Sequence, residues 1–154
     1  MTVAIREARP GEEATVAPLY EWLFAPPGAA VPGWDPQRAA VAIRDAIDSE
    51  EAVVLVAEDR DRLVGLCTAY LELNSVRFGQ RCWVEDLAVD PERRSRGIGG
   101  RLLDEAADWA ARRGATHLEL DTAEARVDAQ RFYERRQPAW RSVSYAFLLE
   151  PGSR

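Results

Sequence analysis

Three glycines and three arginines stand together at the start of a predicted helix, and this combination can bind a phosphate group. In order, the run is Arg93, Arg94, Ser95, Arg96, Gly97, Ile98, Gly99 and Gly100. N–H groups in the first turn of a helix have no acceptor within the helix, and the helix dipole adds positive charge there. Glycines remove the Cβ atoms that would keep a phosphate at a distance. The run therefore predicts an anion site that would hold a pyrophosphate.

A dinucleotide-binding loop is an alternative interpretation of the same run. Asp121 ends the next predicted strand about 20 residues further on, where that fingerprint has an acidic residue. The fingerprint, however, requires a small residue where Leu102 stands, and the stretch from Asp90 to Arg96 is longer than its tight turn. A glycine-rich turn without a ligand is a further alternative. The preceding strand, the following helix and the arginine cluster together favour phosphate binding.

The same segment resembles the coenzyme A loop of the GNAT superfamily of N-acetyltransferases. The resemblance rests on R-x-x-G-x-G, read here from Arg94 to Gly99, and on two flanking stretches in the same order. Leu87 to Pro91 is similar to the strand before that loop, and Ala129 to Glu134 is similar to the A-x-x-F-Y-E helix near the C-terminus. The resemblance covers residues 52–149, and it implies direct transfer of an acetyl group from acetyl-CoA to an amine.

The resemblance also implies a cofactor site made mainly of main-chain atoms. Leu87 would face the thioester carbonyl, Val89 the pantetheine arm, and Arg94 to Gly100 the pyrophosphate. In full, the implied cofactor-binding residues are Leu87, Ala88, Val89, Arg94, Ser95, Arg96, Gly97, Ile98, Gly99, Gly100 and Arg126. Arg126 stands where many members have asparagine, and Gln137 stands in place of the usual glycine after the helix. These departures support an alternative function, a catalytically silent acyl-CoA-binding module or sensor.

Amine acylation needs a base for the amine proton and an acid for the departing thiolate. Tyr133 matches the family's acid by position, and the alternative is a packed core tyrosine. We predict Glu85 as the base, because strand alternation would place Trp83, Glu85 and Leu87 on one face near the reacting carbonyl. Glu85 could act through a water, and a structural ion pair is the alternative. Asp86, on the opposite face, receives no role.

Aromatic residues near the N-terminus are candidates for binding the acceptor. Tyr20, Phe24 and Trp34, together with Glu85, would form the substrate pocket. The nearby acids are Glu12, Glu13 and Glu21, which solvated helix faces explain equally well. The net charge of −6 and the Glu-Asp-Leu pattern, which resembles that of polyamine-acetylating members, favour a small cationic amine such as a polyamine or an aminoglycoside-like molecule. An amino acid or a protein N-terminus stays open as the acceptor.

Hydrophobic periodicity predicts the elements that must position these residues. Strands are expected at 2–8, 52–58, 63–74, 82–89, 117–121 and 142–149, and helices at 12–24, 36–48, 97–113 and 127–136. Asp35 before Pro36 marks a helix start, and Gly114 stands where a C-terminal glycine belongs. The crossover from residue 89 to 117 implies one parallel strand pair. The predicted fold class is α/β, a mixed sheet flanked by helices, in a single domain over residues 1–154.

Composition narrows the classes of partner and location. Twenty basic side chains, all arginine, against 26 acidic ones argue against nucleic acid and membrane partners. The sequence has no apolar run long enough to span a bilayer, so we expect a soluble, cytoplasmic protein. Cys67 and Cys82 lack metal-ligand spacing and are expected to be structural thiols, with no metal. His117 has no recognisable nucleophile near it, which disfavours a hydrolase triad, and aromatic residues on the surface indicate a homodimer.

Overall fold

The computed structural model describes residues 2–151 and divides into two compact units, Met1–Leu120 and Asp121–Arg154. The first unit contains a sheet with helices packed against it. In the described part of the second unit the helix is α5 (Val127–Arg135). The expectation of a single domain over residues 1–154 stays a prediction.

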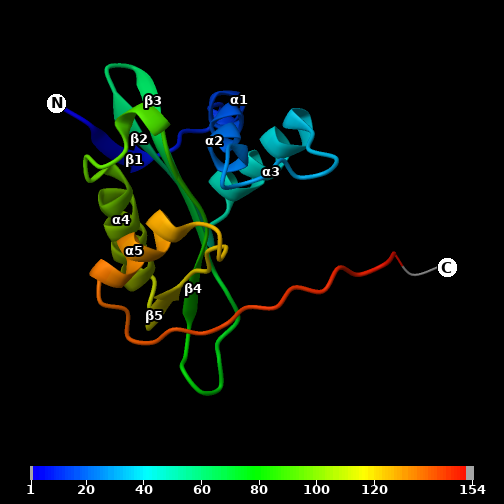
Figure 1. The fold of residues 1–154 in the computed structure, drawn as a ribbon, viewed down its shortest axis with the longest axis vertical. Coiled ribbons are helices and arrows are strands. Elements are labelled where there is room, and N and C mark those ends of the chain that lie inside the picture. The colour runs from blue at the N-terminus through cyan, green and yellow to red at the C-terminus, as the bar shows by residue number, and fades with distance from the viewer. Residues whose placement is uncertain (1, 152–154) are drawn as a thin grey trace. The chain divides into compact units, whose positions relative to one another are not determined.

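A mixed sheet of five strands forms the centre of the first unit (Figure 1). In spatial order the strands are β1 (Ala4–Glu7), β2 (Ala52–Asp59), β3 (Arg62–Leu71), β4 (Arg81–Val89) and β5 (His117–Glu119). The first three pairings are antiparallel, and β4 pairs with β5 in parallel. The predicted α/β class, with a mixed sheet and a parallel pair, is confirmed.

A tight turn joins β2 to β3. Arg60 and Asp61, its central residues, have positive φ angles of 50° and 65°, and Asp59 lies opposite Arg62. Two consecutive left-handed residues are the geometry of a type I′ turn, whose twist matches that of the strands it joins. The predicted hairpin is therefore confirmed. Its turn places charged side chains at the end of β2 and the start of β3.

Short helical segments and one longer helix cover one face of the sheet. They are α1 (Glu13–Val16), the 3-10 turn η1 (Ala17–Tyr20), α2 (Glu21–Phe24) and α3 (Pro36–Asp48). The continuous helix predicted for residues 12–24 is wrong, because Pro18 has no N–H to donate and the chain tightens into η1 around it. The predicted start of α3 is confirmed, since the Asp35 side chain accepts a hydrogen bond from the Gln37 N–H at 2.9 Å.

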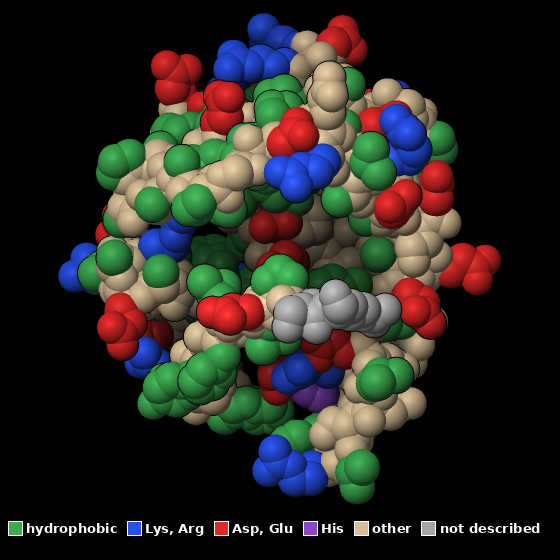
Figure 2. Space-filling view, turned by 90° about the vertical axis from the view of Figure 1, so that its right-hand side faces the viewer, with side chains coloured by type: hydrophobic (Ala, Val, Ile, Leu, Met, Phe, Trp, Pro, Cys, Tyr) green, Lys and Arg blue, Asp and Glu red, His purple; other side chains and the backbone are tan. Residues whose placement is uncertain are grey.

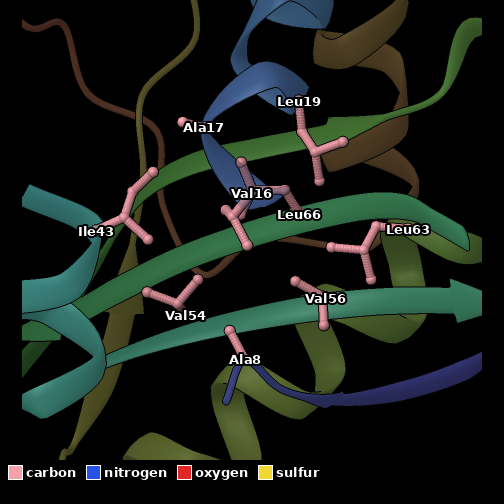
Figure 3. Packing of buried hydrophobic residues seen from close by; sticks show 9 residues of the cluster. All are labelled: Ala8, Val16, Ala17, Leu19, Ile43, Val54, Val56, Leu63 and Leu66. Carbon is pink, nitrogen blue, oxygen red and sulfur yellow. The ribbon is translucent and has the colours of Figure 1, made fainter. Parts of the chain in front are cut away.

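The helices on this face bury a hydrophobic cluster against β2 and β3. Figure 3 shows Val54, Val56 and Leu66 of the sheet beneath side chains of the helices, among them Val16 and Ile43. Val16, Val56 and Leu66 have no exposed surface. Burial of this apolar surface is the main force that holds α1 and α3 on the sheet.

The helix α4 (Ile98–Arg112) covers the opposite face (Figure 1). It lies so close to β3 that a Cβ on Gly65 would stand 2.9 Å from Leu102 Cδ1 and 3.2 Å from Ile98 Cγ2. Gly65 therefore lets the start of α4 approach the sheet. Gly114 ends the helix with φ of 86°, as predicted for a C-terminal glycine.

In the second unit, the secondary structure after α5 differs from the one predicted. Residues 142–149 form no strand, and the alternating side chains of Val143, Tyr145 and Phe147 are 74%, 80% and 83% exposed. The predicted strand is wrong, because alternation suits a strand only where another strand supplies hydrogen-bond partners for its backbone. Gln137 has a φ of 55°, so this position keeps the left-handed backbone for which glycine is best suited.

No helix of the described residues is long and apolar enough to cross a membrane.

A network of charges joins β1 to the start of α1. Arg6 donates hydrogen bonds to Glu12 at 2.8 Å and to Glu58 of β2 at 2.9 Å. The hydrogen bond from Arg6, helped by one from the Arg9 N–H, lowers the pKa of Glu12 from its ordinary value of 4.5 to about 2. Glu12 therefore pairs with the sheet, and its expected place among the acids of the substrate pocket is not supported.

Glu12→Gln should destabilise the protein at pH 7, by an amount that shrinks as the pH falls. A carboxylate whose pKa is lower in the folded state stabilises that state above its unfolded pKa, and the contribution is lost between about 4.5 and about 2. Urea unfolding of the wild type and the variant at pH 7 and pH 3 measures this difference. Glu7→Gln, at an exposed side chain of β1, is the matched control. A difference that is constant across this pH range would contradict the assignment.

Candidate functional site

Two buried carboxylates tie the loop after β4 to the β2–β3 hairpin. Asp90, 4% exposed, accepts hydrogen bonds from the Glu92 N–H at 3.0 Å and from Arg62 Nη2 at 3.2 Å. Asp59, 8% exposed, accepts one from Arg93 Nη1 at 2.5 Å. Removing one partner of a buried ion pair is costly, so these contacts hold the turn η2 (Pro91–Arg93) in place.

This anchoring role was not predicted from the sequence for either aspartate. The available signal was an acidic residue at the end of each of two predicted strands, with arginines in the segments that follow. Arg93, expected to add charge beside the phosphate, instead holds the loop against Asp59.

The backbone at the start of α4 is arranged as an anion site. Ser95 and Gly97 have positive φ angles of 61° and 80°, and Gly97 is the residue before the first turn of α4. Within the described residues, no side chain caps this end of the helix. The N–H groups of the first turn therefore remain available to a ligand, at the positive end of the helix dipole.

The side chains of the predicted pyrophosphate loop fall into two groups. Arg94, Ser95 and Arg96 are exposed, whereas Ile98 is 2% exposed and packs beneath Gly65. Ile98 can therefore contact a ligand only through its main chain. A Cβ on Gly99 would meet only Val89, at an ordinary 3.7 Å, so packing alone does not require glycine there.

The strands β4 and β5 separate after a short stretch of pairing. Their register joins Arg81, Cys82 and Trp83 to residues 117–119, and β5 ends at Glu119. From Val84 to Val89 that edge of β4 has no paired strand in the described structure. This unpaired edge of β4 runs directly into the loop that leads to α4. The predicted cofactor residues Leu87, Ala88 and Val89 belong to this stretch, and Ala88 is 6% exposed.

A β-bulge in β4 sets the direction of the acidic side chains. Thr68 of β3 lies opposite Asp86, but its neighbour Ala69 lies opposite Val84. Glu85 is therefore an extra residue in β4, and an extra residue reverses the alternation of the side chains that follow it.

Because of the bulge, Trp83 and Asp86 share one face of the sheet, and Leu87 points to the face of α4. The prediction that Trp83, Glu85 and Leu87 point to one face is wrong for Leu87. Glu85 is exposed, and its Oε2 accepts a hydrogen bond from Trp83 Nε1 at 2.8 Å. Strand periodicity could not reveal the extra residue, because a bulge depends on the partner strand.

Asp86, to which the sequence pattern assigned no role, joins the helices to the sheet. Its Oδ2 accepts hydrogen bonds from Tyr20 Oη at 2.7 Å and from Thr68 Oγ1 at 2.6 Å. Burial raises the pKa of Tyr20, and the charge of Asp86 raises it further. The Tyr20 phenol is therefore held as a hydrogen-bond donor to Asp86.

Tyr20, Trp34 and Phe24 pack together as an aromatic wall. The Tyr20 ring stacks on Trp34 with the ring centroids 5.6 Å apart, and Phe24 meets Trp34 edge to face at 4.8 Å. The structure thus brings together the three aromatic residues that were predicted for the substrate pocket. Of the three predicted acids nearby, Glu13 is held by Arg44 at 3.1 Å.

A cleft with a volume of about 370 Å³ opens beside this wall, between α3 and the sheet. Tyr20, Trp34, Tyr70 and Glu85 line it, and most of the remaining lining is aliphatic. The pKa of Tyr70 is raised by burial and then by the nearby charge of Glu85. On the face drawn in Figure 2, acidic and basic side chains are interspersed and do not form one basic patch.

Tyr133 and Arg126 belong to the second unit. Arg126 precedes the first turn of α5, and Tyr133 lies in its last turns, where its ring meets Phe132 edge to face at 5.1 Å. The roles predicted for Tyr133 and Arg126 stay predictions.

The two cysteines are buried in β3 and β4 as free thiols. Burial raises the pKa of Cys67 to about 12 and that of Cys82 to about 11. A thiol with so high a pKa is a poor nucleophile, so the interpretation of structural thiols is supported.

Tyr20→Phe should destabilise the protein by about 1 to 3 kcal/mol, because it removes a hydrogen bond to a charged, half-buried carboxylate. Denaturant unfolding at pH 7 measures the change. Tyr145→Phe is the matched control, since the Tyr145 side chain is 80% exposed, and it should change stability little. Equal effects of the two variants would show that the bond to Asp86 does not hold the wall.

Comparison with known proteins places these features in a family. Residues 16–137 match the model of the family described as Acetyltransferase (GNAT) family. An uncharacterized N-acetyltransferase of Bacillus subtilis (strain 168), YhfO, is 32% identical over 133 residues, which cover 84% of this chain and 85% of that protein.

Solved acetyltransferases share the fold at low sequence identity. The aminoglycoside acetyltransferase AAC(6')-Iy, in complex with a bisubstrate analog of CoA and acetylneamine, has a TM-score of 0.80 at 16% identity, covering 97% of this chain and 100% of that one. An aminoglycoside acetyltransferase from an uncultured soil metagenomic sample, meta-AAC0020, has a TM-score of 0.77 at 18% identity and covers 97% of each chain. At these identities the likeness concerns the fold alone.

Proposed function

The chain belongs to the GNAT family of acetyltransferases, and on that premise we propose that it transfers the acetyl group of acetyl-CoA directly to a primary amine of a small cationic molecule. The observation that carries this proposal is the anion site at the start of α4, next to the unpaired edge of β4. The pyrophosphate of acetyl-CoA needs an anion site, and its amide-containing pantetheine arm needs an unpaired strand edge beside that site.

The residues of this segment fit acetyl-CoA by their chemistry. The main-chain N–H groups from Gly97 to Gly100 and the exposed Arg94 would hold the pyrophosphate. The main chain of Leu87 and Val89 would bond to the pantetheine arm along the unpaired edge of β4. Acetyl-CoA supplies an acetyl thioester, whose C–S bond breaks as the amide C–N bond forms.

Two side chains move the protons in this proposal. Glu85 accepts a proton from the substrate ammonium, directly or through a water, so that the neutral amine can attack. Its position in the bulge supports this role, because it is exposed and lines the cleft. Tyr133 donates a proton to the departing thiolate, a role that rests on its place in the A-x-x-F-Y-E helix.

The cleft is where we place the acceptor amine. Tyr20, Trp34 and Glu85 line it, and Phe24 packs edge to face against Trp34. Polyamines and aminoglycoside-like molecules are the first acceptors to test, because the net charge is −6 and similar folds include aminoglycoside acetyltransferases.

A silent acyl-CoA-binding module is the second candidate function. Arg126 and Gln137 favour it, since both depart from the residues usual in the family at the ends of α5. Such a module would bind acetyl-CoA and turn over no amine.

Acetyl-CoA should raise the melting temperature of the protein, and NAD should not, because a ligand that binds the native state stabilises it. Arg94→Ala should weaken acetyl-CoA binding about tenfold by removing a charge-assisted hydrogen bond. Arg9→Ala, at an exposed arginine beyond β1, is the control and should leave binding unchanged. A shift with NAD alone would instead identify a dinucleotide-binding protein.

Tyr133→Phe should lower kcat about 100-fold and leave the KM for acetyl-CoA nearly unchanged, because the phenol acts only as charge develops on the thiolate. Thiol release from acetyl-CoA in the presence of an amine panel measures both constants. Tyr145→Phe, at an exposed position of the same unit, is the control. Unchanged kcat would remove Tyr133 from the mechanism, and binding without turnover of any amine would support the silent module.

A further inference from the structure

The cleft offers an acceptor almost no free polar group. Its α3 wall consists of Ala39, Ala42, Ile43 and Ala46, and the sheet adds further aliphatic side chains. Of the three hydroxyl groups in its lining, those of Tyr20 and Thr68 donate to Asp86, and that of Tyr70 lies beside the Glu85 carboxylate. A substrate hydroxyl placed against the α3 wall would lose its hydrogen bonds to water and gain none from these side chains.

One anionic group faces the cleft among the residues that line it. The Glu85 carboxylate engages the Trp83 indole N–H through one oxygen, Oε2. A single carboxylate complements one ammonium group. A second or third ammonium on the same molecule would lie against alanine and isoleucine, at a cost in desolvation.

The aromatic wall, on the other side of the cleft from α3, suits an aromatic ring or an aliphatic group of the acceptor. Tyr20 and Trp34 stack with an interplanar angle of 28°, and the bond to Asp86 fixes the Tyr20 ring. Aromatic faces attract both apolar rings and ammonium groups. An apolar cavity of about 150 Å³ holds a benzene molecule, so a cleft of about 370 Å³ has room for a ring and a short aminoalkyl chain.

From these observations we propose that the acceptor is a primary monoamine on a compact apolar body, of the arylalkylamine class. The ring lies between the aromatic wall and α3, and the amine reaches Glu85. This inference rests on the proposed function and narrows its acceptor, because the lining of the cleft favours a monoamine over the polyamines and aminoglycoside-like molecules that the net charge favours.

Turnover of matched amines tests this specificity. With acetyl-CoA, kcat/KM for 2-phenylethylamine and tryptamine should exceed that for spermidine and neamine by about tenfold or more, the scale on which an unpaired polar group or a lost apolar contact discriminates. A higher kcat/KM for spermidine or neamine would overturn the proposal.

Direct binding separates this inference from the proposed function. Calorimetric titration of the protein, saturated with CoA, with 2-phenylethylamine and with neamine reports the cleft's preference whether or not chemistry occurs. Tighter binding of 2-phenylethylamine without turnover would support the acceptor class and contradict catalysis. No binding of 2-phenylethylamine would overturn the acceptor class even if another amine were acetylated.

A variant of the α3 wall supplies the final test. Ala42→Asp places a second carboxylate in the cleft at an exposed helix position, so the fold should tolerate it. It should shift the ratio of kcat/KM, or of affinity, toward spermidine by about tenfold. Val41→Asp is the matched control, because Val41 is also exposed on α3 and is not part of the cleft lining. Equal shifts in both variants would indicate a general charge effect and overturn the assignment of the wall.

Discussion

Two hydrogen bonds to a single oxygen of Asp86 connect the parts of the first unit that surround the cleft. Thr68 donates from the neighbouring strand, and Tyr20 donates from the helical segments that cross above the sheet. Because Tyr20 stacks on Trp34, the same bond also orders a ring of the loop before α3. Without it, the Tyr20 ring would be held over the sheet mainly by non-directional apolar burial, which fixes position less precisely.

The bulge at Glu85 makes this arrangement available. It turns Asp86 toward the helices and leaves Glu85 beside the cleft, so two adjacent carboxylates take different tasks. One is engaged by two hydroxyl groups and positions the wall. Glu85 faces the cleft, where the amine would lose its proton in the proposed function. A regular strand would have sent these two side chains to opposite faces of the sheet.

A second pair of carboxylates organises the loop before α4, where the proposed function places the pyrophosphate. Asp59 and Asp90 bind arginines of the loop and of the hairpin, and they hold the chain as it leaves the sheet for α4. Gly65 allows α4 to lie close against β3, so the start of this helix is fixed relative to β4. The start of α4 and the cleft beside Glu85 therefore both depend on the strands β3 and β4.

Local sequence determined the elements whose signals are local. Asp35 and Pro36 mark the start of α3, Gly114 marks the end of α4, and the glycine-rich run with its arginines indicates an anion site. The α/β class and the parallel strand pair followed from the order of these elements. The break at Pro18 also has a local cause, a proline inside a predicted helix. The loss of the strand at residues 142–149 and the bulge at Glu85 were decided by the tertiary structure. Each depends on a hydrogen-bond partner, present or absent, elsewhere in the chain, and a pattern of residue types along one strand contains no information about that partner.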